Sequence, residues 1–155
     1  MDLNLLRDFL RVYAFQPATA FFRAIEVPAL IDLGIPVGVG IDIGCGDGRL
    51  TEILIRRIGR RDFVGVDPDA QETTEARRRN FYTAVHTTGA ERIPEADSRF
   101  DFAISNSVLE HIPGLDLVLA GVSRVLKRGG IFCLTVPHAG FAQSTRRGLI
   151  SVWRM

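Results

Sequence analysis

Cysteine, histidine and long apolar runs are all scarce in this sequence of 155 residues. The two cysteines, Cys45 and Cys133, lie far apart where small apolar residues would also fit, so a reducing, cytoplasmic setting is the simplest interpretation. The three histidines and two cysteines show no ligand spacing, and no metal site is predicted. No stretch approaches about 18 uncharged apolar residues, which argues against a membrane span, and charged side chains interrupt the N-terminal region, which argues against a signal peptide.

An excess of charge of either sign is also lacking. Nineteen basic and 18 acidic residues give a formal net charge of +1, so nothing global attracts nucleic acid, an acidic substrate or an anionic membrane. The run Arg77–Arg79 has no aromatic residues interleaved with it, which favours a solvated helix face over a nucleic-acid patch. Without repeats or low-complexity segments, the length suits one domain.

A glycine-rich loop is the most informative feature. The apolar run Val37 to Ile43 is interrupted by Gly44, Gly46 and Gly48, and a helical pattern from Leu50 to Ile58 comes next. Glycine reaches positive φ and has no Cβ, so backbone can lie against a ligand, while the helix beyond the loop presents unpaired N–H groups. We therefore expect a strand, a tight loop and a helix that together bind a ligand with a negative group.

The spacing of the glycines narrows the class of ligand. The dinucleotide fingerprint G-x-G-x-x-G requires glycine where this chain has Arg49, which disfavours NAD. The run from Asp42 to Gly48, DIGCGDG, instead resembles the first motif of the class I S-adenosylmethionine (SAM)-dependent methyltransferases of the small-molecule type. A glycine loop alone also occurs in structural turns, so the hypothesis depends on the residues beyond the loop.

A carboxylate lies at an informative distance from the loop. Phe63 to Asp67 reads as a short buried strand ending in an acid, about 20 residues beyond the loop, where a βαβ unit brings such a side chain next to the first loop. Asp67 could then accept hydrogen bonds from both ribose hydroxyls of an adenosine. The alternative is an incidental exposed Asp67 that starts a turn with Pro68.

Later segments extend the resemblance. Gly89 to Pro94 and the apolar strand from Phe100 to Asn106 are similar to the family's adenine-binding segment and fourth strand. Members often carry an acidic residue where this chain has Gly89, so Glu91 or the main chain of Ala90 would have to serve instead. The run LKRGGIFCLTVP resembles the family's fifth strand, which we expect from Ile131 to Val136.

The segment from Asn106 to Pro113 resembles the family's methyl-transfer side. His111 is a candidate general base within it, and the alternative is that it braces the loop or caps the next helix. His138, beyond the end of the fifth strand, is a second candidate for a base or a substrate contact.

Two helices are predicted before the first strand, at Leu3 to Ala14 and Ala18 to Leu33, with Pro28 kinking or dividing the second. The apolar side of the second helix is expected to run through Phe21, Phe22, Ile25 and Leu30. Four aromatic residues of this region either cover a cofactor or, more simply, pack in a helix-to-sheet core: Tyr13, Phe15, Phe21 and Phe22.

The alternation of strands and helices predicts an α/β fold with a doubly wound, mostly parallel (Rossmann-like) sheet and a site at the carboxyl ends of its central strands. Residues 1–36 would form an N-terminal helical cap, 37–137 the core and 138–155 a tail. The family's sixth and seventh strands have no room, so the fold is expected to be truncated after the fifth strand. We predict that residues 140–155 either shield the exposed edge of that strand or dock on a second copy, giving a homodimer.

The resemblance implies SAM as cofactor and a methyl transfer to a small-molecule acceptor by in-line displacement. Gly44, Gly46 and Gly48 would floor the methionine part, Asp42 would orient the loop and the ammonium group, and Asn106 would offer main-chain contact. Asp67 would hold the ribose and Ala90 and Glu91 would flank adenine, with Cys45 and Pro68 among the binding residues. The alternatives are a non-catalytic SAM-binding or interaction domain and an NAD-dependent oxidoreductase.

Overall fold

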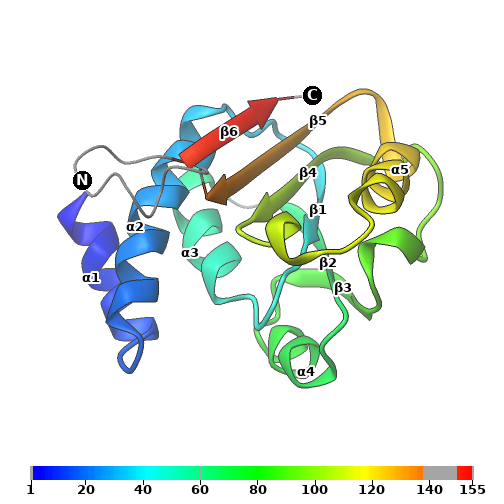
Figure 1. Cartoon of the computed structure of the whole chain (residues 1–155). Coiled ribbons are helices and arrows are strands. Elements are labelled where there is room, and N and C mark those ends of the chain that lie inside the picture. Colours follow the sequence, from blue (N-terminus) through cyan, green and yellow to red (C-terminus); the bar gives the residue numbers. More distant parts are fainter. Residues whose placement is uncertain (1, 60, 138–149, 155) are drawn as a thin grey trace.

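A computed structural model describes residues 2–59, 61–137 and 150–154. It contains one six-stranded sheet in the order β3-β2-β1-β4-β5-β6 (Figure 1). The neighbouring strands from β3 through β5 pair in parallel, and β6 pairs antiparallel with β5. The strands are β1 Val39–Ile43, β2 Asp62–Asp67, β3 Tyr82–Thr87, β4 Phe100–Asn106, β5 Leu126–Pro137 and β6 Ile150–Arg154. This order confirms the doubly wound fold and puts its switch point between β1 and β4, where such sheets bind ligands.

Helices cover both faces of the sheet (Figure 1). The side chains of Asp2 and Asp69 accept hydrogen bonds from backbone N–H groups at the starts of α1 and α4, as expected of N-cap residues. The helices are α1 Leu3–Val12, α2 Pro17–Asp32, α3 Arg49–Ile58, α4 Ala70–Arg78 and α5 Leu115–Val125, with the 3-10 turns η1 Ala90–Arg92 and η2 Leu109–His111.

Two apolar clusters hold the layers together. One joins α1, α2 and α3 to one face of the sheet and includes Phe9, Phe63 and Phe102. The other joins η1 and α5 to the opposite face and includes Phe100 and Phe132. Because both faces are covered, the central strands are almost continuously apolar, which is typical of parallel sheets.

The buried side of α2 differs from the predicted one. Phe21 and Phe22 are 43% and 38% exposed, whereas Ala20, Ala24 and Val27 are buried. Small side chains allow a helix backbone to lie close to its neighbours, and this packing outweighs the larger apolar area of the phenylalanines. The core interpretation is therefore wrong for Phe21 and Phe22.

Two further expectations about the N-terminal region are corrected. Phe15, in the turn between α1 and α2, is fully exposed and is not part of the core. Pro28 does not divide the second helix, because α2 runs without interruption from Pro17 to Asp32.

The sheet continues beyond the expected last strand. β5 begins at Leu126, ahead of the predicted Ile131, and its pairing with β4 jumps from Phe100↔Leu126 to Phe102↔Ile131 across an irregularity. β6 then pairs with β5 from Cys133↔Arg154 to Pro137↔Ile150, so the expectation that the fold stops after five strands is wrong. Residues 150–154 are the described part of the segment that was predicted either to shield the β5 edge or to dock on a second copy, and they pair with that edge. Dimerisation through an exposed β5 edge therefore loses its basis, and the rest of that segment lies outside the described residues.

None of the helices in the described part of the chain combines the length and apolar character needed to cross a membrane.

Candidate functional site

The glycine loop joins β1 to α3 at the switch point of the sheet. Gly44 has φ of +73°, and a Cβ placed on it would lie 2.5 Å from both methyl carbons of Val108, which comes after β4. Only glycine fits both the conformation and the space. The loop after β1 and the segment after β4 are therefore in direct contact at this point.

Several N–H groups of the loop are bonded within the chain. Gly44 and Cys45 donate to the carbonyl oxygen of Val66 at 2.8 and 3.1 Å. Gly46 N–H donates to Asp67 Oδ2 at 2.9 Å, and Arg49 N–H to Asp47 Oδ1 at 3.0 Å. The expected ligand with a negative group is thus a wrong prediction for these donors, because carbonyl and carboxylate oxygens of the protein already occupy them.

Asp67 lies beside the loop, as its spacing predicts. Besides Gly46, it accepts a hydrogen bond from Asp69 N–H at 2.9 Å through Oδ1, in the turn that Pro68 begins. An ionised carboxylate offers about four lone-pair positions. Asp67 therefore keeps acceptor capacity for two hydroxyl groups while it organises the loop.

Asp42 lies beneath the loop and is buried. Its Oδ2 accepts hydrogen bonds from Thr51 Oγ1 at 2.6 Å and from the Tyr82 hydroxyl at 2.5 Å. Burial raises the pKa of Asp42 to about 6, against the opposing effect of these hydrogen bonds, and the nearby charge of Asp67 adds to the rise. Burial also raises the pKa of Tyr82 well above its ordinary value, and Asp42 contributes to that shift. Sequence reasoning missed both Thr51 and Tyr82.

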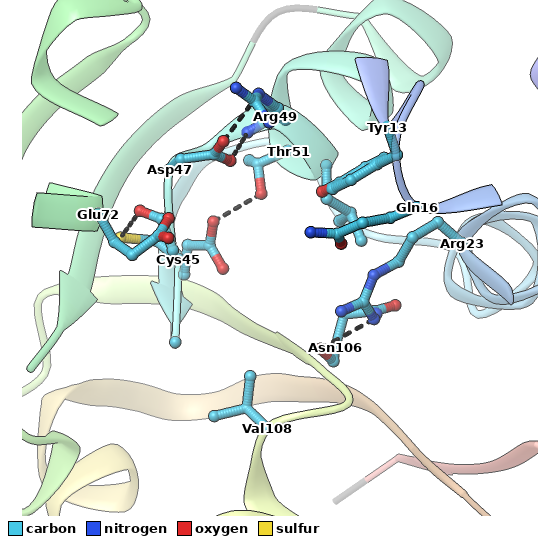
Figure 2. A pocket seen from close by; sticks show the side chains of 14 residues that line it. Tyr13, Gln16, Arg23, Cys45, Asp47, Arg49, Thr51, Glu72, Asn106 and Val108 are labelled. Atoms are coloured by element: carbon cyan, nitrogen blue, oxygen red, sulfur yellow. Dashed lines mark hydrogen bonds and ion pairs between the residues drawn. The ribbon is translucent and has the colours of Figure 1, made fainter. Parts of the chain in front are cut away.

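A cavity of about 260 Å³ opens above the loop (Figure 2). Such a volume lies just below the range of about 300–1,000 Å³ that is usual for small-molecule sites, so it suits part of a nucleotide-sized ligand. Its wall comes from the N-terminal helices and their connection, its floor from the β1 loop and α3, and its far side from the segment after β4. The lining residues are Tyr13, Gln16, Arg23, Asp42, Gly44, Cys45, Gly46, Asp47, Arg49, Leu50, Thr51, Glu72, Asn106 and Val108.

The loop side of this cavity is acidic. Asp47 is paired with Arg49 at 2.8 Å, while within the described residues the Glu72 carboxylate has neither a hydrogen bond nor an ion pair. Burial raises the pKa of Glu72, and the neighbouring charges of Asp47, Asp69 and Asp67 raise it further. The unpaired Glu72 carboxylate favours a cation here.

The β4 side of the cavity is built around Glu26, a buried carboxylate on α2. Glu26 Oε2 accepts from Arg23 Nη1 and from Asn106 Nδ2, both at 2.7 Å, and Oε1 accepts from the Ser107 hydroxyl. Figure 2 shows the Arg23 side chain extending to Asn106 at the end of β4. Arg23 and Glu26 were not identified from the sequence. Their spacing of i, i+3 on one helix was the available signal.

Several predicted site residues lie outside this cavity. Gly48, Asp67, Pro68, Ala90 and Glu91 are not among its lining residues. Gly48 begins α3, and Ala90 and Glu91 belong to η1. The Glu91 carboxylate fills the space that a side chain on residue 89 would enter, because a Cβ on Gly89 would collide with it.

The predicted catalytic histidines are not brought into the cavity. The His111 side chain is 78% exposed and is not a lining residue, and the ring lies 3.8 Å from Glu110 Oε1. His138 lies outside the described residues. Cys45 lines the cavity, but burial raises the pKa of its thiol, so it is not a reactive thiolate. In the parts of the chain that the structure describes, no cluster of three or more histidine, cysteine, aspartate or glutamate residues is arranged to hold a metal ion.

Comparison with known proteins places the chain in a family. The family model described as "Methyltransferase domain" matches residues 41–134, from the middle of β1 into β5. The chain is 34% identical over 142 residues to a dimethylglycine N-methyltransferase of Parasynechococcus marenigrum, covering 86% of this chain and 49% of that protein. It is 32% identical over 101 residues to a ubiquinone biosynthesis O-methyltransferase of Agrobacterium fabrum, covering 62% of this chain and 40% of that protein. The chain thus spans less than half the length of these relatives.

A solved structure agrees with these relatives. A SAM-dependent methyltransferase from Thermotoga maritima, named as a possible histamine N-methyltransferase, superposes with a TM-score of 0.66 at 25% identity, covering 86% of this chain and 60% of that one. The matched family model, the relatives and the sheet order lead to one conclusion: the chain belongs to the class I SAM-dependent methyltransferases.

Proposed function

We propose that this chain binds SAM and transfers its methyl group to a small-molecule acceptor. The observation that carries the proposal is the acidic glycine loop, in which the N–H groups of Gly44, Cys45, Gly46 and Arg49 are bonded to Val66, Asp67 and Asp47. A pyrophosphate needs free N–H donors at such a loop, whereas a sulfonium or an ammonium group is attracted by carboxylates. The loop therefore suits SAM and disfavours NAD.

Different residues at the carboxyl edge of the sheet would contact different parts of SAM. Asp67 would accept hydrogen bonds from the ribose hydroxyls, and Ala90 and Glu91 would flank the adenine. Gly44, Cys45 and Gly46 would lie beneath the methionine part. Gly48 would cap the start of α3, and Pro68 would shape the turn after Asp67. Asp42 would keep the loop in place from beneath through Thr51 and Tyr82.

The amino-acid end would lie toward α2 and β4. The guanidinium of Arg23 can bind a carboxylate, and Asn106 can accept from an ammonium group through its side-chain oxygen or its main-chain carbonyl. Two buried polar atoms at this place, Arg23 Nε and Asn106 Oδ1, have no partner within the described residues, and they fit a ligand that supplies both an acceptor and a donor.

Bound SAM would supply a methyl group on a sulfonium sulfur for in-line attack by the acceptor. The chain would promote this step by alignment and by excluding water between the N-terminal helices and Val108. His111 is exposed, so the proposal does not depend on it as a base. The names of the relatives, which include dimethylglycine and ubiquinone-pathway methyltransferases, support a small-molecule acceptor.

Calorimetric titration of the purified chain with S-adenosylhomocysteine (SAH), SAM and NAD tests the binding step. Micromolar binding of SAH and SAM without binding of NAD supports the proposal. Binding of NAD alone, or of none of the three by a folded chain, contradicts it.

Mass measurement of products then tests the transfer. The chain is incubated with methyl-labelled SAM and candidate acceptors, dimethylglycine and phenolic compounds among them. A labelled product supports the enzyme hypothesis. Tight SAM binding without any product in this panel favours the alternative, a non-catalytic SAM-binding domain. This alternative is considered because the chain covers 49% of its dimethylglycine N-methyltransferase relative.

A further inference from the structure

Unpaired polar atoms gather at one place in this molecule. Within the described residues, the buried side-chain polar atoms without a hydrogen-bond partner are Arg23 Nε, Asn106 Oδ1 and Thr135 Oγ1. Asn106 and Thr135 are register partners at the carboxyl ends of β4 and β5, and Arg23 Nη1 lies 3.5 Å from the carbonyl oxygen of Asn106. Buried polar groups are normally paired, so an accumulation of unpaired ones marks a place of functional interest.

Glu26 is the residue that organises this junction. It is 7% exposed, and its carboxylate receives the side chains of Arg23, Asn106 and Ser107. Ser107 has φ of +50°, an uncommon conformation for a residue other than glycine, and its N–H donates to the Thr135 carbonyl oxygen at 2.9 Å. Glu26 thereby ties α2 to the end of β4 across 80 residues of sequence.

The bonds to Glu26 determine which atoms of its partners stay available. Arg23 uses Nη1 for Glu26, which leaves the Nε and Nη2 edge of the guanidinium. Such an edge can bind a carboxylate with two parallel hydrogen bonds. Asn106 uses its NH₂ group for Glu26, which fixes the amide so that Oδ1 remains as an acceptor. One carboxylate-binding edge and one ammonium acceptor therefore lie at the same junction.

We propose that Glu26 is a positioning residue that orients Arg23 and Asn106 to bind an amino-acid group, the α-carboxylate at Arg23 and the α-ammonium at Asn106. The inference rests on the proposed function and assigns this group to the methionine end of the cofactor. An amino-acid acceptor carries the same chemistry, and the test separates the two sources.

The test compares two ligands that differ only at this end. SAH carries the amino-acid group, whereas 5′-methylthioadenosine has the adenosine and the thioether without it. Glu26→Gln keeps the shape but removes the charge that holds Arg23, and we expect its Kd for SAH to rise about tenfold. The Kd for 5′-methylthioadenosine should change less than about twofold, because that ligand makes no contact at the junction.

Two further variants sharpen the result. Glu75→Gln is the control, because Glu75 also pairs with an arginine three residues away, Arg78 on α4, and does not line the cavity. This variant should leave the Kd of both ligands unchanged. Arg23→Lys keeps the charge but loses the guanidinium edge. Combining it with Glu26→Gln should cost less SAH affinity than the sum of the two single effects, because Glu26 acts in part through Arg23.

The outcomes are distinct. Equal losses for both ligands in Glu26→Gln mean a general structural role and overturn the proposal, as does no loss for either. If Glu26→Gln loses affinity only for an amino-acid acceptor such as dimethylglycine, the junction binds the amino-acid group of the acceptor. This result overturns the assignment to the cofactor. If Glu26→Gln does not fold, Glu26→Asp keeps the charge but withdraws it by one methylene, and a selective loss of SAH affinity is again required. A wild-type chain that binds neither ligand contradicts the proposed function itself, and the inference falls with it.

Discussion

The carboxyl edge of the sheet has two halves that differ in how their polar groups are paired. In the β1/β2 half, the N–H groups of Gly44, Cys45 and Gly46 and the carboxylates of Asp42 and Asp67 are bonded within the chain. In the β4/β5 half, Glu26 accepts hydrogen bonds from three side chains, while Arg23 Nε, Asn106 Oδ1 and Thr135 Oγ1 have no partner within the described residues. The loop donors of the first half are thus used within the chain, whereas the second half keeps buried polar atoms that have no partner in the described residues.

The two halves also differ in how they are assembled. The bond that closes the β1/β2 half, from Gly46 to Asp67, spans 21 residues and forms within one βαβ unit. The bonds that build the β4/β5 half, from Asn106 and Ser107 to Glu26, span 80 and 81 residues and require α2 to be packed on the sheet. A ligand that bridges the halves would therefore depend on α2 at one end only.

The largest expected effect is at the contact between the halves. Gly44→Ala places a side chain at φ of +73° and into Val108, so we expect the free energy of unfolding to fall by about 2–5 kcal/mol. Gly34→Ala is the control, since Gly34 has φ of +70° and open space around it, and should cost about 1–2 kcal/mol. Urea unfolding followed by circular dichroism measures both. Equal losses would show that the Val108 contact is unimportant.

The free energy of unfolding should depend on pH because of Asp42 in the β1/β2 half. The pKa of Asp42 is about 6 in the folded chain against 3.8 as its ordinary value, so between these values the folded state holds more protons than the unfolded state. The stabilisation from Asp42 is therefore present below about pH 4 and lost as pH rises through about 6, on the order of 2–3 kcal/mol. Asp42→Asn should lack this change. Unfolding measured from pH 4 to 8 checks it, and a constant difference between the two proteins contradicts the buried carboxylate.

A smaller effect is expected on ligand binding through Asp67. Asp67→Asn keeps the shape of the side chain but removes the charge that would hold the ribose hydroxyls, and the Kd for SAH should rise about tenfold, or about 1.4 kcal/mol. Asp62→Asn, at the exposed start of the same strand, is the matched control and should have no effect. If the two variants bind SAH equally well, the ribose is not held by Asp67.

The smallest effect is expected at His111. Its side chain is largely exposed and does not line the cavity, so His111→Gln should change SAH affinity and the rate of methyl transfer by less than about threefold. General bases contribute about 10²–10⁴-fold. A loss of that size in the rate at unchanged affinity would assign the base to His111 and add a catalytic group to the β4/β5 half.

Sequence reasoning succeeded where structure depends on local pattern. The strand Phe100–Asn106 has the predicted bounds, and Asp67 lies beside the glycine loop. Each of these depends on the periodicity of one element or on the geometry of one βαβ unit. The β1/β2 half was therefore recognisable from its motif.

The remainder depends on contacts between distant segments. Tyr82 reaches Asp42 across 40 residues, and Arg23 reaches the Asn106 carbonyl across 83. No single helix or strand pattern contains both partners of such a contact. The same reason explains why Phe21 and Phe22 of α2 are exposed while Leu30 is buried as predicted, because the fit of Ala20 and Ala24 against the sheet is a property of two surfaces together.

The most direct test of the divided site is a crystal structure of the chain with SAH bound. We predict the ribose hydroxyls within hydrogen-bond distance of Asp67 and the amino-acid end between Arg23 and Asn106, so that Arg23 Nε and Asn106 Oδ1 gain partners. SAH bound elsewhere, or bound with these two atoms still unpaired, would contradict the division of the site into an adenosine half and an amino-acid half.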